Sequence, residues 1–256
     1  MPMKRNVLVI GIGAGNPDYI TVQAIDALNR ADVFFIPNKG TEKEELARLR
    51  HEICDRFIRD RTYRMIEFDV PVREKASATY RGGVADWHAR IGDIYRRMLT
   101  DDMQEGECGA FLVWGEPALF DSTIRILDTI NASQALDLDF KIIPGISSVQ
   151  ALAARHRIAL NLIGEPIAIT TGRKLAEGFP ENVGSVVVVL DGENSFTAVE
   201  EDVDIFWGAY LGTEDEILVS GRLREVSEEI TRVRKAARQQ KGWIMDTYLL
   251  RRTKSD

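Results

Sequence analysis

The stretch Ala110-Phe-Leu-Val-Trp-Gly-Glu-Pro-Ala-Leu-Phe-Asp-Ser-Thr123 joins an apolar run to a turn and then to the start of a helix. The apolar residues predict a buried strand, and the polar residues 121–122 are typical of a helix start. Gly115 allows a ligand to approach the main chain closely, and Pro117 fixes the turn. Glu116 therefore places a carboxylate at the carboxyl end of a buried strand, where open α/β sheets bind ligands.

Strands and helices alternate along the whole chain, which predicts an α/β fold. In the first half, strands are predicted at 7–10, 33–36, 65–70, 111–114 and 140–143. Helices are predicted to begin at 21, 41, 86, 122 and 148. The polar segment 73–84 contains Gly82 and Gly83 and is expected to be a loop. The first sheet should be mainly parallel, because helical segments connect its strands.

The second half begins after a link at 157–166, so we expect two α/β domains, 1–161 and 162–256. Strands are predicted at 167–170, 185–190, 205–211, 217–220 and 243–250, with a charged helix at 225–240. The connection from 211 to 217 is too short for a parallel crossover and favours an antiparallel hairpin. The second sheet is therefore expected to be mixed.

Composition limits the classes of function. A chain of 256 residues with 45% hydrophobic content can bury two cores, and a net charge of −7 argues against a broad surface for nucleic acid. No apolar stretch approaches the roughly 20 residues of a membrane span. The two cysteines, Cys54 and Cys108, and three histidines show no metal-ligand spacing and no disulfide framework. A reducing, cytoplasmic setting is expected.

A glycine-rich turn follows the first strand, as it does in dinucleotide-binding enzymes. Gly11, Gly13 and Gly15 form a GxGxG pattern, but the dinucleotide fingerprint needs its third glycine where this chain has Asn16. The pattern therefore argues against a nicotinamide or flavin site. A tight turn without a ligand and a loop bordering a cofactor cleft both stay open.

Three segments together resemble the tetrapyrrole methylase family. They are Val7-Leu-Val-Ile-Gly-Ile-Gly-Ala-Gly-Asn-Pro-Asp18, the segment from Ala110 quoted above, and Ile142-Ile-Pro-Gly-Ile-Ser-Ser148. Members of this family transfer a methyl group from S-adenosylmethionine to corrinoid and sirohaem precursors. Further matches run from about residue 6 to residue 252, chiefly at 207–213 and 242–246. They imply the branch of aerobic cobalamin synthesis in which methylation is coupled to release of acetate.

The resemblance implies a cofactor cleft between the two domains, with S-adenosylhomocysteine as product and no metal. The expected cofactor contacts are Gly115, Glu116, Leu119, Ser147, Ser148, Leu190, Ala209 and Tyr210. The family usually has aspartate where this chain has Glu116, so the carboxylate here reaches one methylene farther. A carboxylate at this position suits the ammonium group of S-adenosylmethionine.

The tetrapyrrole substrate carries many carboxylates, and the planar fork of arginine binds such groups in pairs. Arg173 and Arg81 are the expected substrate contacts. The candidates for the base that activates water are Glu116, Asp191, His88, Glu193 and Asp86. The sequence does not choose among them.

The resemblance also implies a homodimer, while composition gives the expectation of a cytoplasmic protein with no nucleic-acid or membrane partner. Two alternatives to the acetate-releasing reaction stay open. One is a sibling methylase that acts on another corrinoid precursor or a different acceptor. The other is a non-catalytic protein that binds S-adenosylmethionine or a tetrapyrrole.

Overall fold

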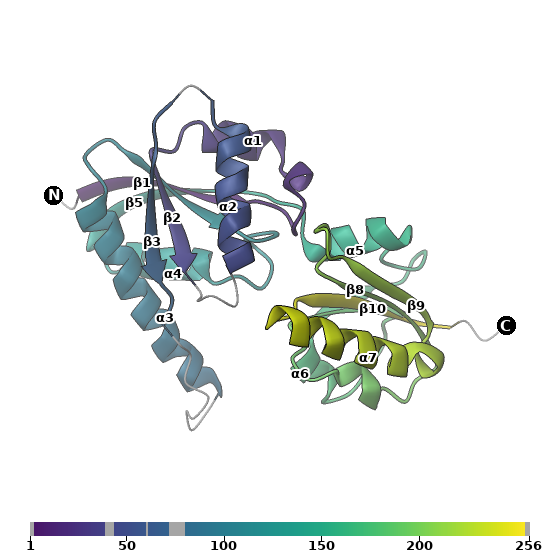
Figure 1. Ribbon diagram of the computed structural model, residues 1–256. Helices are drawn as coiled ribbons and strands as arrows, with labels where there is room; N and C mark the ends of the chain where they lie inside the picture. Colours follow the sequence, from purple (N-terminus) through teal and green to yellow (C-terminus); the bar gives the residue numbers. More distant parts are fainter. Residues whose placement is uncertain (1–2, 39–43, 60, 72–79, 254–256) are drawn as a thin grey trace. The chain divides into compact units, whose positions relative to one another are not determined.

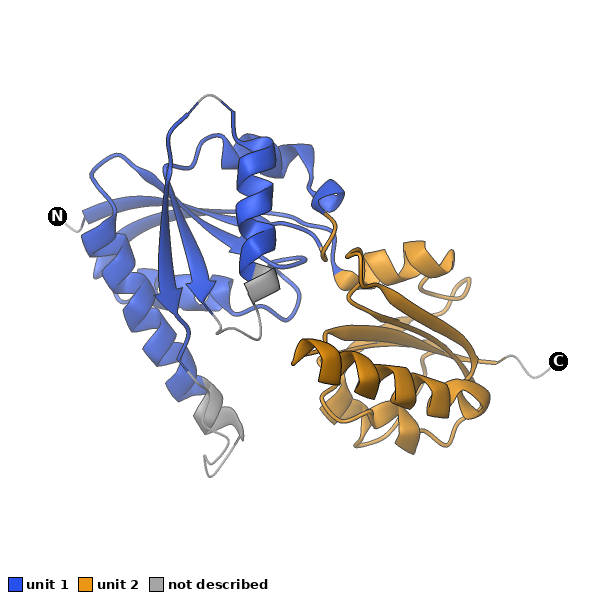
Figure 2. Ribbon diagram, in the orientation of Figure 1, with its two compact units in different colours: residues 1–13, 17–147 blue, residues 14–16, 148–256 orange. Residues whose placement is uncertain are grey.

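The computed structural model describes residues 3–38, 44–59, 61–71 and 80–253. The chain divides into two compact units (Figure 2): unit 1 comprises Met1–Gly13 and Pro17–Ser147, and unit 2 comprises Ala14–Asn16 and Ser148–Asp256. Each unit has its own five-stranded sheet (Figure 1). The predicted division at 161 assigns helix α5 (Ser148–His156) to the first domain, whereas its contacts assign it to unit 2.

Unit 1 contains a parallel sheet with the strand order β3-β2-β4-β1-β5. The strands are β1 (Met3–Gly11), β2 (Val33–Asn38), β3 (Arg64–Asp69), β4 (Cys108–Val113) and β5 (Leu136–Ile143). The helices are α1 (Val22–Leu28), α2 (Glu44–Phe57), α3 (Tyr80–Arg97) and α4 (Thr123–Ala132), with short helical turns at Pro17–Tyr19 and Met98–Asp102. The prediction of a parallel first sheet is confirmed.

Helices cover both faces of this sheet (Figure 1). Side chains alternate along β1, so Val7 and Val9 pack in the cluster that includes α3 and α4, while Leu8 and Ile10 pack in the cluster that includes α1 and α2. A strand buried on both faces has no polar side to show. This is why the part of β1 from Val7 to Ile10 is a continuous apolar run, whereas the preceding Lys4, Arg5 and Asn6 are polar.

The start of α3 corrects one prediction. The sequence predicted a loop to residue 84, because two adjacent glycines each disfavour a helix by about 1 kcal/mol. The helix instead begins at Tyr80 and includes Gly82 and Gly83. Downstream, Ile91 and Tyr95 bury their side chains against the sheet, and such packing outweighs local propensity. The rest of the expected loop, and the predicted helix start at Thr41, lie outside the described residues.

Unit 2 contains a mixed sheet, as predicted, and its strand order is β6-β7-β10-β8-β9. The strands are β6 (Ile167–Thr171), β7 (Ser185–Val189), β8 (Val203–Ala209), β9 (Ile217–Arg222) and β10 (Asp246–Arg252). The remaining helices are α6 (Gly172–Leu175) and α7 (Leu223–Lys241), with a helical turn at Ser195–Ala198. The predicted antiparallel hairpin is the β8–β9 pair.

Two segments that follow strands of unit 1 in the sequence belong to unit 2. Helix α5 packs on the second sheet, where the ring of His156 lies 3.0 Å from the carbonyl oxygen of Trp207. Residues 14–16, which follow β1, also belong to unit 2. Gly15 has φ +119°, and a Cβ added to it would lie 2.4 Å from the carbonyl oxygen of Leu211. Only a glycine fits so close to that carbonyl.

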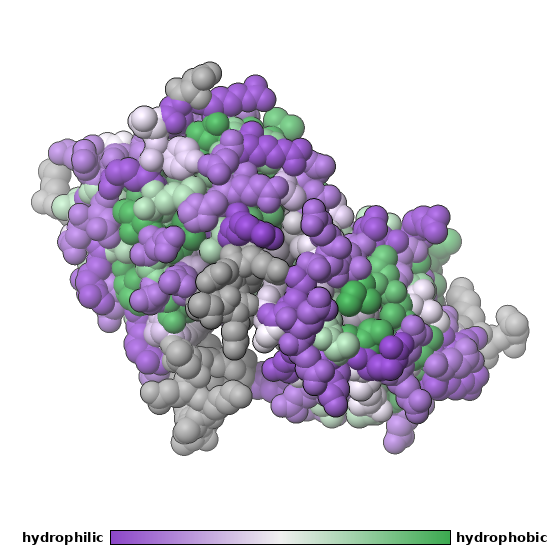
Figure 3. All heavy atoms as spheres, in the orientation of Figure 1, coloured by the Kyte–Doolittle hydropathy of each residue, from purple (hydrophilic) through white to green (hydrophobic). Residues whose placement is uncertain are grey.

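Charged residues make up 29% of the chain, and hydrophilic side chains cover much of the face drawn in Figure 3. Among the helices of the described residues, none combines the length and apolar character that a bilayer crossing requires.

Candidate functional site

Three turns singled out in the sequence meet at the carboxyl edge of the first sheet. Gly13 and Gly115 form an isolated antiparallel bridge, in which the Gly115 N–H donates to the Gly13 carbonyl at 2.8 Å. Gly145, from the turn after β5, packs against the turn that contains Gly115 and against Gly11 at the end of β1. A Cβ on Gly145 would lie 2.2 Å from the Gly115 carbonyl oxygen and 2.8 Å from the Cα of Gly11. The backbones of these turns are therefore in direct contact.

This edge contains a topological switch point. The chain leaves β1 toward the face that α1 covers, and it leaves the neighbouring β4 toward the face that α4 covers. The loops that follow the two strands therefore diverge. In open α/β sheets, ligands bind where loops of adjacent strands diverge in this way.

Glu116 links two of the turns. Its Oε2 accepts the N–H of Gly145 at 2.8 Å, and its Oε1 accepts the N–H of Ala118 at 2.8 Å. A carboxylate oxygen has two lone pairs, so each oxygen keeps one acceptor position for a ligand. The N–H of Leu119 donates to the Glu116 carbonyl at 3.1 Å and closes the turn. Glu116 thus has a structural role that the sequence did not reveal.

The two predicted serine contacts are divided between the units. Ser147 is buried and is the last residue of unit 1. Ser148 begins α5 in unit 2, and its Oγ accepts a hydrogen bond from Oγ1 of Thr247 at 3.0 Å. The hydroxyl of Ser148 therefore holds α5 to the start of β10.

The predicted site residues of unit 2 lie along one edge of its sheet. Strands β6, β7 and β8 end at the edge where the antiparallel β10 begins. Leu190 and Tyr210 directly follow β7 and β8, with φ of 53° and 50°. Residues other than glycine rarely adopt positive φ, and such strain is concentrated at functional sites.

The three apolar candidates at this edge differ in exposure. The side chain of Leu190 is 67% exposed. Ala209 and Tyr210 are buried, and the hydroxyl of Tyr210 donates to the carbonyl oxygen of Trp243 at 2.6 Å. A ligand can contact the Leu190 side chain directly, whereas Ala209 and Tyr210 are packed inside the unit.

Asp191 is a buried acceptor with four donors. Its Oδ1 accepts the Glu193 N–H and the Ser195 hydroxyl, both at 3.0 Å. Its Oδ2 accepts the Ser195 N–H and the Tyr248 hydroxyl, both at 2.7 Å. Burial raises the pKa of Tyr248, and the charge of Asp191 raises it further. The four donors match the four lone pairs of the carboxylate, so Asp191 acts here as a structural acceptor.

A second buried acid lies beside it. Asp246 Oδ2 accepts hydrogen bonds from Nε of Arg234 at 2.8 Å and from Nε1 of Trp207 at 2.9 Å. Arg234 also donates to the carbonyl oxygen of Asp191. The sequence placed Arg234 only on a charged helix, and no local signal indicates its burial.

The two predicted substrate arginines belong to different units. Arg173 is exposed in α6, which follows β6 at the site edge of unit 2. Its neighbour Gly172 packs against Asp191, since an added Cβ would lie 2.4 Å from Oδ1. Arg81 is in α3 of unit 1, and its side chain is outside the described part of the structure.

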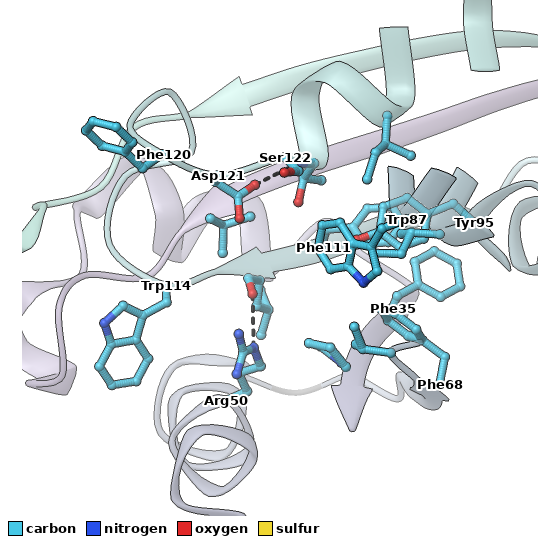
Figure 4. Close-up of a pocket in the computed structure, with 17 residues that line it drawn as sticks. Phe35, Arg50, Phe68, Trp87, Tyr95, Phe111, Trp114, Phe120, Asp121 and Ser122 are labelled. Atoms are coloured by element: carbon cyan, nitrogen blue, oxygen red, sulfur yellow. Dashed lines mark hydrogen bonds between the residues drawn. The ribbon is translucent and has the colours of Figure 1, made fainter. Parts of the chain in front are cut away.

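A cavity of about 240 Å³ opens at the carboxyl end of β4 in unit 1 (Figure 4). We call it the aromatic pocket. Its apolar wall contains Phe35, Phe68, Trp87, Tyr95, Phe111 and Phe120. Its polar lining contains Arg50, Asp121, Ser122 and Thr123.

The aromatic pocket forms where two strands separate. Strand β2 pairs with β4 only as far as Phe35, although it follows β3 to Asn38. Pro37 has no N–H to continue the pairing. Nε of Arg50 donates instead to the carbonyl oxygen of Leu112 at 3.0 Å. Burial lowers the pKa of Arg50 to about 10, so its side chain is cationic at neutral pH.

His88 and Ser122 form a pair beside this pocket. Nε2 of His88, on α3, lies 2.9 Å from Oγ of Ser122, at the start of α4. Burial lowers the pKa of His88, and the positive charge of Arg125 lowers it further. The sequence identified His88 as a candidate base and Ser122 as a helix start. It missed their pairing because 34 residues separate them.

Residues 6–227 match the family of tetrapyrrole (corrin/porphyrin) methylases. The chain is 54% identical over 249 residues to precorrin-6A synthase (deacetylating) of Sinorhizobium sp, covering 97% of this chain and 95% of the relative.

Two solved structures are also similar. A putative cobalamin synthesis related protein (CobF) from Corynebacterium diphtheriae is 36% identical with a TM-score of 0.82, and the match covers 98% of this chain and 100% of the other. Uroporphyrin-III C-methyl transferase from Thermus thermophilus, complexed with S-adenyl homocysteine, is 16% identical with a TM-score of 0.55 and 96% coverage of both chains. The last similarity concerns the fold.

Proposed function

The chain belongs to the tetrapyrrole methylase family, and from this membership we propose that it methylates precorrin-5 with S-adenosylmethionine to give precorrin-6A and acetate. The observation that carries this proposal is the 54% identity over nearly the whole chain to a deacetylating precorrin-6A synthase. The reaction is a step of cobalamin biosynthesis.

The reaction changes two bonds at carbon 1 of the macrocycle. Water adds to the carbonyl of the acetyl group, the bond from that carbonyl to carbon 1 breaks, and acetate leaves. The electron pair left on carbon 1 then attacks a methyl group. When bound, S-adenosylmethionine supplies this methyl on a positively charged sulfur. One water is consumed and two protons are released for each acetate.

The residues of the site suit a ligand with an ammonium group. Glu116 keeps one acceptor position on each oxygen, and a charged hydrogen bond contributes roughly 1.5–3 kcal/mol. In unit 1 we propose cofactor contacts from Gly115, Glu116, Leu119 and Ser147. In unit 2 we propose contacts from Ser148, Leu190, Ala209 and Tyr210.

For the substrate, we propose that Arg173 and Arg81 bind carboxylates of the macrocycle. Correct placement of two reactants can supply up to about 7–11 kcal/mol of the barrier, so positioning is the main contribution expected of this site. On the family resemblance we also propose a homodimer, and from cysteine usage a cytoplasmic setting. Sedimentation analysis of the purified protein measures its oligomeric state.

The test is a direct assay with precorrin-5 and S-adenosylmethionine. We expect one acetate per methyl transferred, measured by an acetate assay and by mass spectrometry of the macrocycle. Methylation without acetate would assign the chain to a sibling activity. Cofactor binding without either product would indicate a binding protein.

A further inference from the structure

The His88–Ser122 pair has the arrangement of a base and a nucleophile. The 2.9 Å between Nε2 and Oγ is hydrogen-bond distance, as proton transfer between the two groups requires. Burial and Arg125 favour the neutral imidazole, which is the form that accepts a proton. Ser122 also begins α4 without a capping hydrogen bond from its side chain. Its hydroxyl is therefore directed to His88 rather than to its own helix.

Ser122 lines the aromatic pocket, and Figure 4 shows it at the start of α4. Ligand pockets for a whole drug-sized molecule measure about 300–1,000 Å³. The cavity of about 240 Å³ is smaller than this range, so it suits one substituent of a large substrate rather than the whole macrocycle. Its aromatic wall suits the methyl end of an acetyl group, and its polar lining suits the carbonyl end.

Resting on the proposed function, we propose that Ser122 is the nucleophile that removes the acetyl group of the substrate, with His88 as its general base and the aromatic pocket as the acetyl subsite. Ser122 then carries the acetyl group as an ester before water releases it. Both residues thereby become catalytic residues of the deacetylation.

The covalent route balances as follows. Oγ of Ser122 bonds to the acetyl carbonyl carbon while its proton moves to Nε2 of His88. The bond from that carbon to carbon 1 breaks, and its electron pair stays on the macrocycle for methylation. His88 then releases its proton to solvent and accepts one from the water that attacks the ester. The ester bond breaks, Ser122 regains a proton from His88, and acetic acid leaves as acetate and a proton.

The start of α4 supplies donors for the oxyanion that forms on the acetyl oxygen. The N–H of Thr123 is already used, because it donates to Oδ1 of Asp121 at 2.7 Å. The next amides of the first helical turn have no intrahelical acceptor, and such amides stabilise developing negative charge.

The first test compares acetate release from precorrin-5 by the full-length wild type, Ser122→Ala and His88→Gln. We expect each substitution to slow release by about 10²–10⁴-fold while binding of S-adenosylmethionine is unchanged. Ser122→Cys should restore part of the rate, because a thiol is also a nucleophile. Ser133→Ala is the matched control, since Ser133 lies at the other end of α4 and donates to the Ile130 carbonyl.

The second test looks for the intermediate. Wild-type enzyme mixed with precorrin-5 and quenched in acid should carry one acetyl group on the peptide that contains Ser122, detected by mass spectrometry. The acetyl group should be absent from Ser122→Ala. Its absence from the wild type during turnover would overturn the covalent route, whatever the rate of the alanine variant.

A pH profile separates catalysis from packing. Acetate release should rise with pH to a plateau, with a midpoint below the ordinary histidine pKa of about 6.5, and His88→Gln should remove this rise. Arg125 and Asp121 are the charged groups of α4 and its preceding loop near the pair.

If wild type and Ser122→Ala release acetate equally, the dyad is wrong and the proposed function stands. If the wild type releases none, both fail.

Discussion

Substitution of Glu116 tests whether one carboxylate both holds the turns together and serves the cofactor. Its two oxygens accept the Gly145 and Ala118 amides at 2.8 Å each. A hydrogen bond to a charged acceptor contributes about 1.5–3 kcal/mol, and the half-buried position favours the lower end. Glu116→Ala should therefore lower the free energy of unfolding by about 2–3 kcal/mol in urea denaturation. Glu116→Gln keeps one acceptor oxygen and should lose about half as much.

The same two variants test whether binding of the cofactor depends on the charge of the Glu116 side chain or on its shape. Glu116→Ala should raise the dissociation constant of S-adenosylmethionine about tenfold to a hundredfold, at 1.4 kcal/mol per decade. Glu116→Gln should approach that loss, because it removes the charge and keeps the shape. Calorimetry measures both constants. Unchanged unfolding in the alanine variant would refute the structural role, and an unchanged constant in both variants would refute the cofactor contact.

Three further experiments concern other parts of the chain. Gly145→Ala puts a Cβ 2.2 Å from the Gly115 carbonyl oxygen and should lower the free energy of unfolding, measured in urea, by about 3 kcal/mol. Its control, Gly92→Ala in α3, puts a Cβ 3.8 Å from its nearest neighbour and should raise the free energy of unfolding by about 0.5–1 kcal/mol. Asp246→Asn leaves the buried charge of Arg234 without its counter-charge and should cost about 3–5 kcal/mol, so a normal Tm would contradict that account. Arg173→Ala should raise KM for precorrin-5 more than KM for the cofactor, with a smaller change in kcat. A rise in KM for the cofactor alone would show that Arg173 does not bind the substrate.

The elements that the sequence predicted best are those decided by local pattern. The apolar runs at 7–10 and 110–113 lie in β1 and β4 and are buried on both faces, so each of their residues is apolar and the strands are visible in the sequence. The turn at Gly115 was also visible, since glycine and proline interrupt the run. By contrast, α3 starts in a segment whose local propensity favours a loop, and packing of residues farther along decides its fold.

Partners far apart in the chain could not be predicted. The sequence located Glu116, but its acceptor role toward Gly145 depends on a residue 29 positions later. The sequence named Asp191 as a candidate base, but it could not show that the Tyr248 hydroxyl, 57 positions away, donates to its carboxylate. A hydrogen-bond pattern made by distant segments leaves no periodic signal in either segment.

The membership of residues 14–16 in unit 2 sets an order of events during synthesis. Gly15 lies against the Leu211 carbonyl, which a ribosome translating 5–20 residues per second makes on the order of 10–40 s later. Strand β1 finds its partners β4 and β5 well before that time, because both precede residue 144. The parallel sheet can therefore form on the nascent chain before residues 14–16 make their contacts with unit 2. A segment translated long before Leu211 therefore reaches its native contacts only after the first sheet has formed.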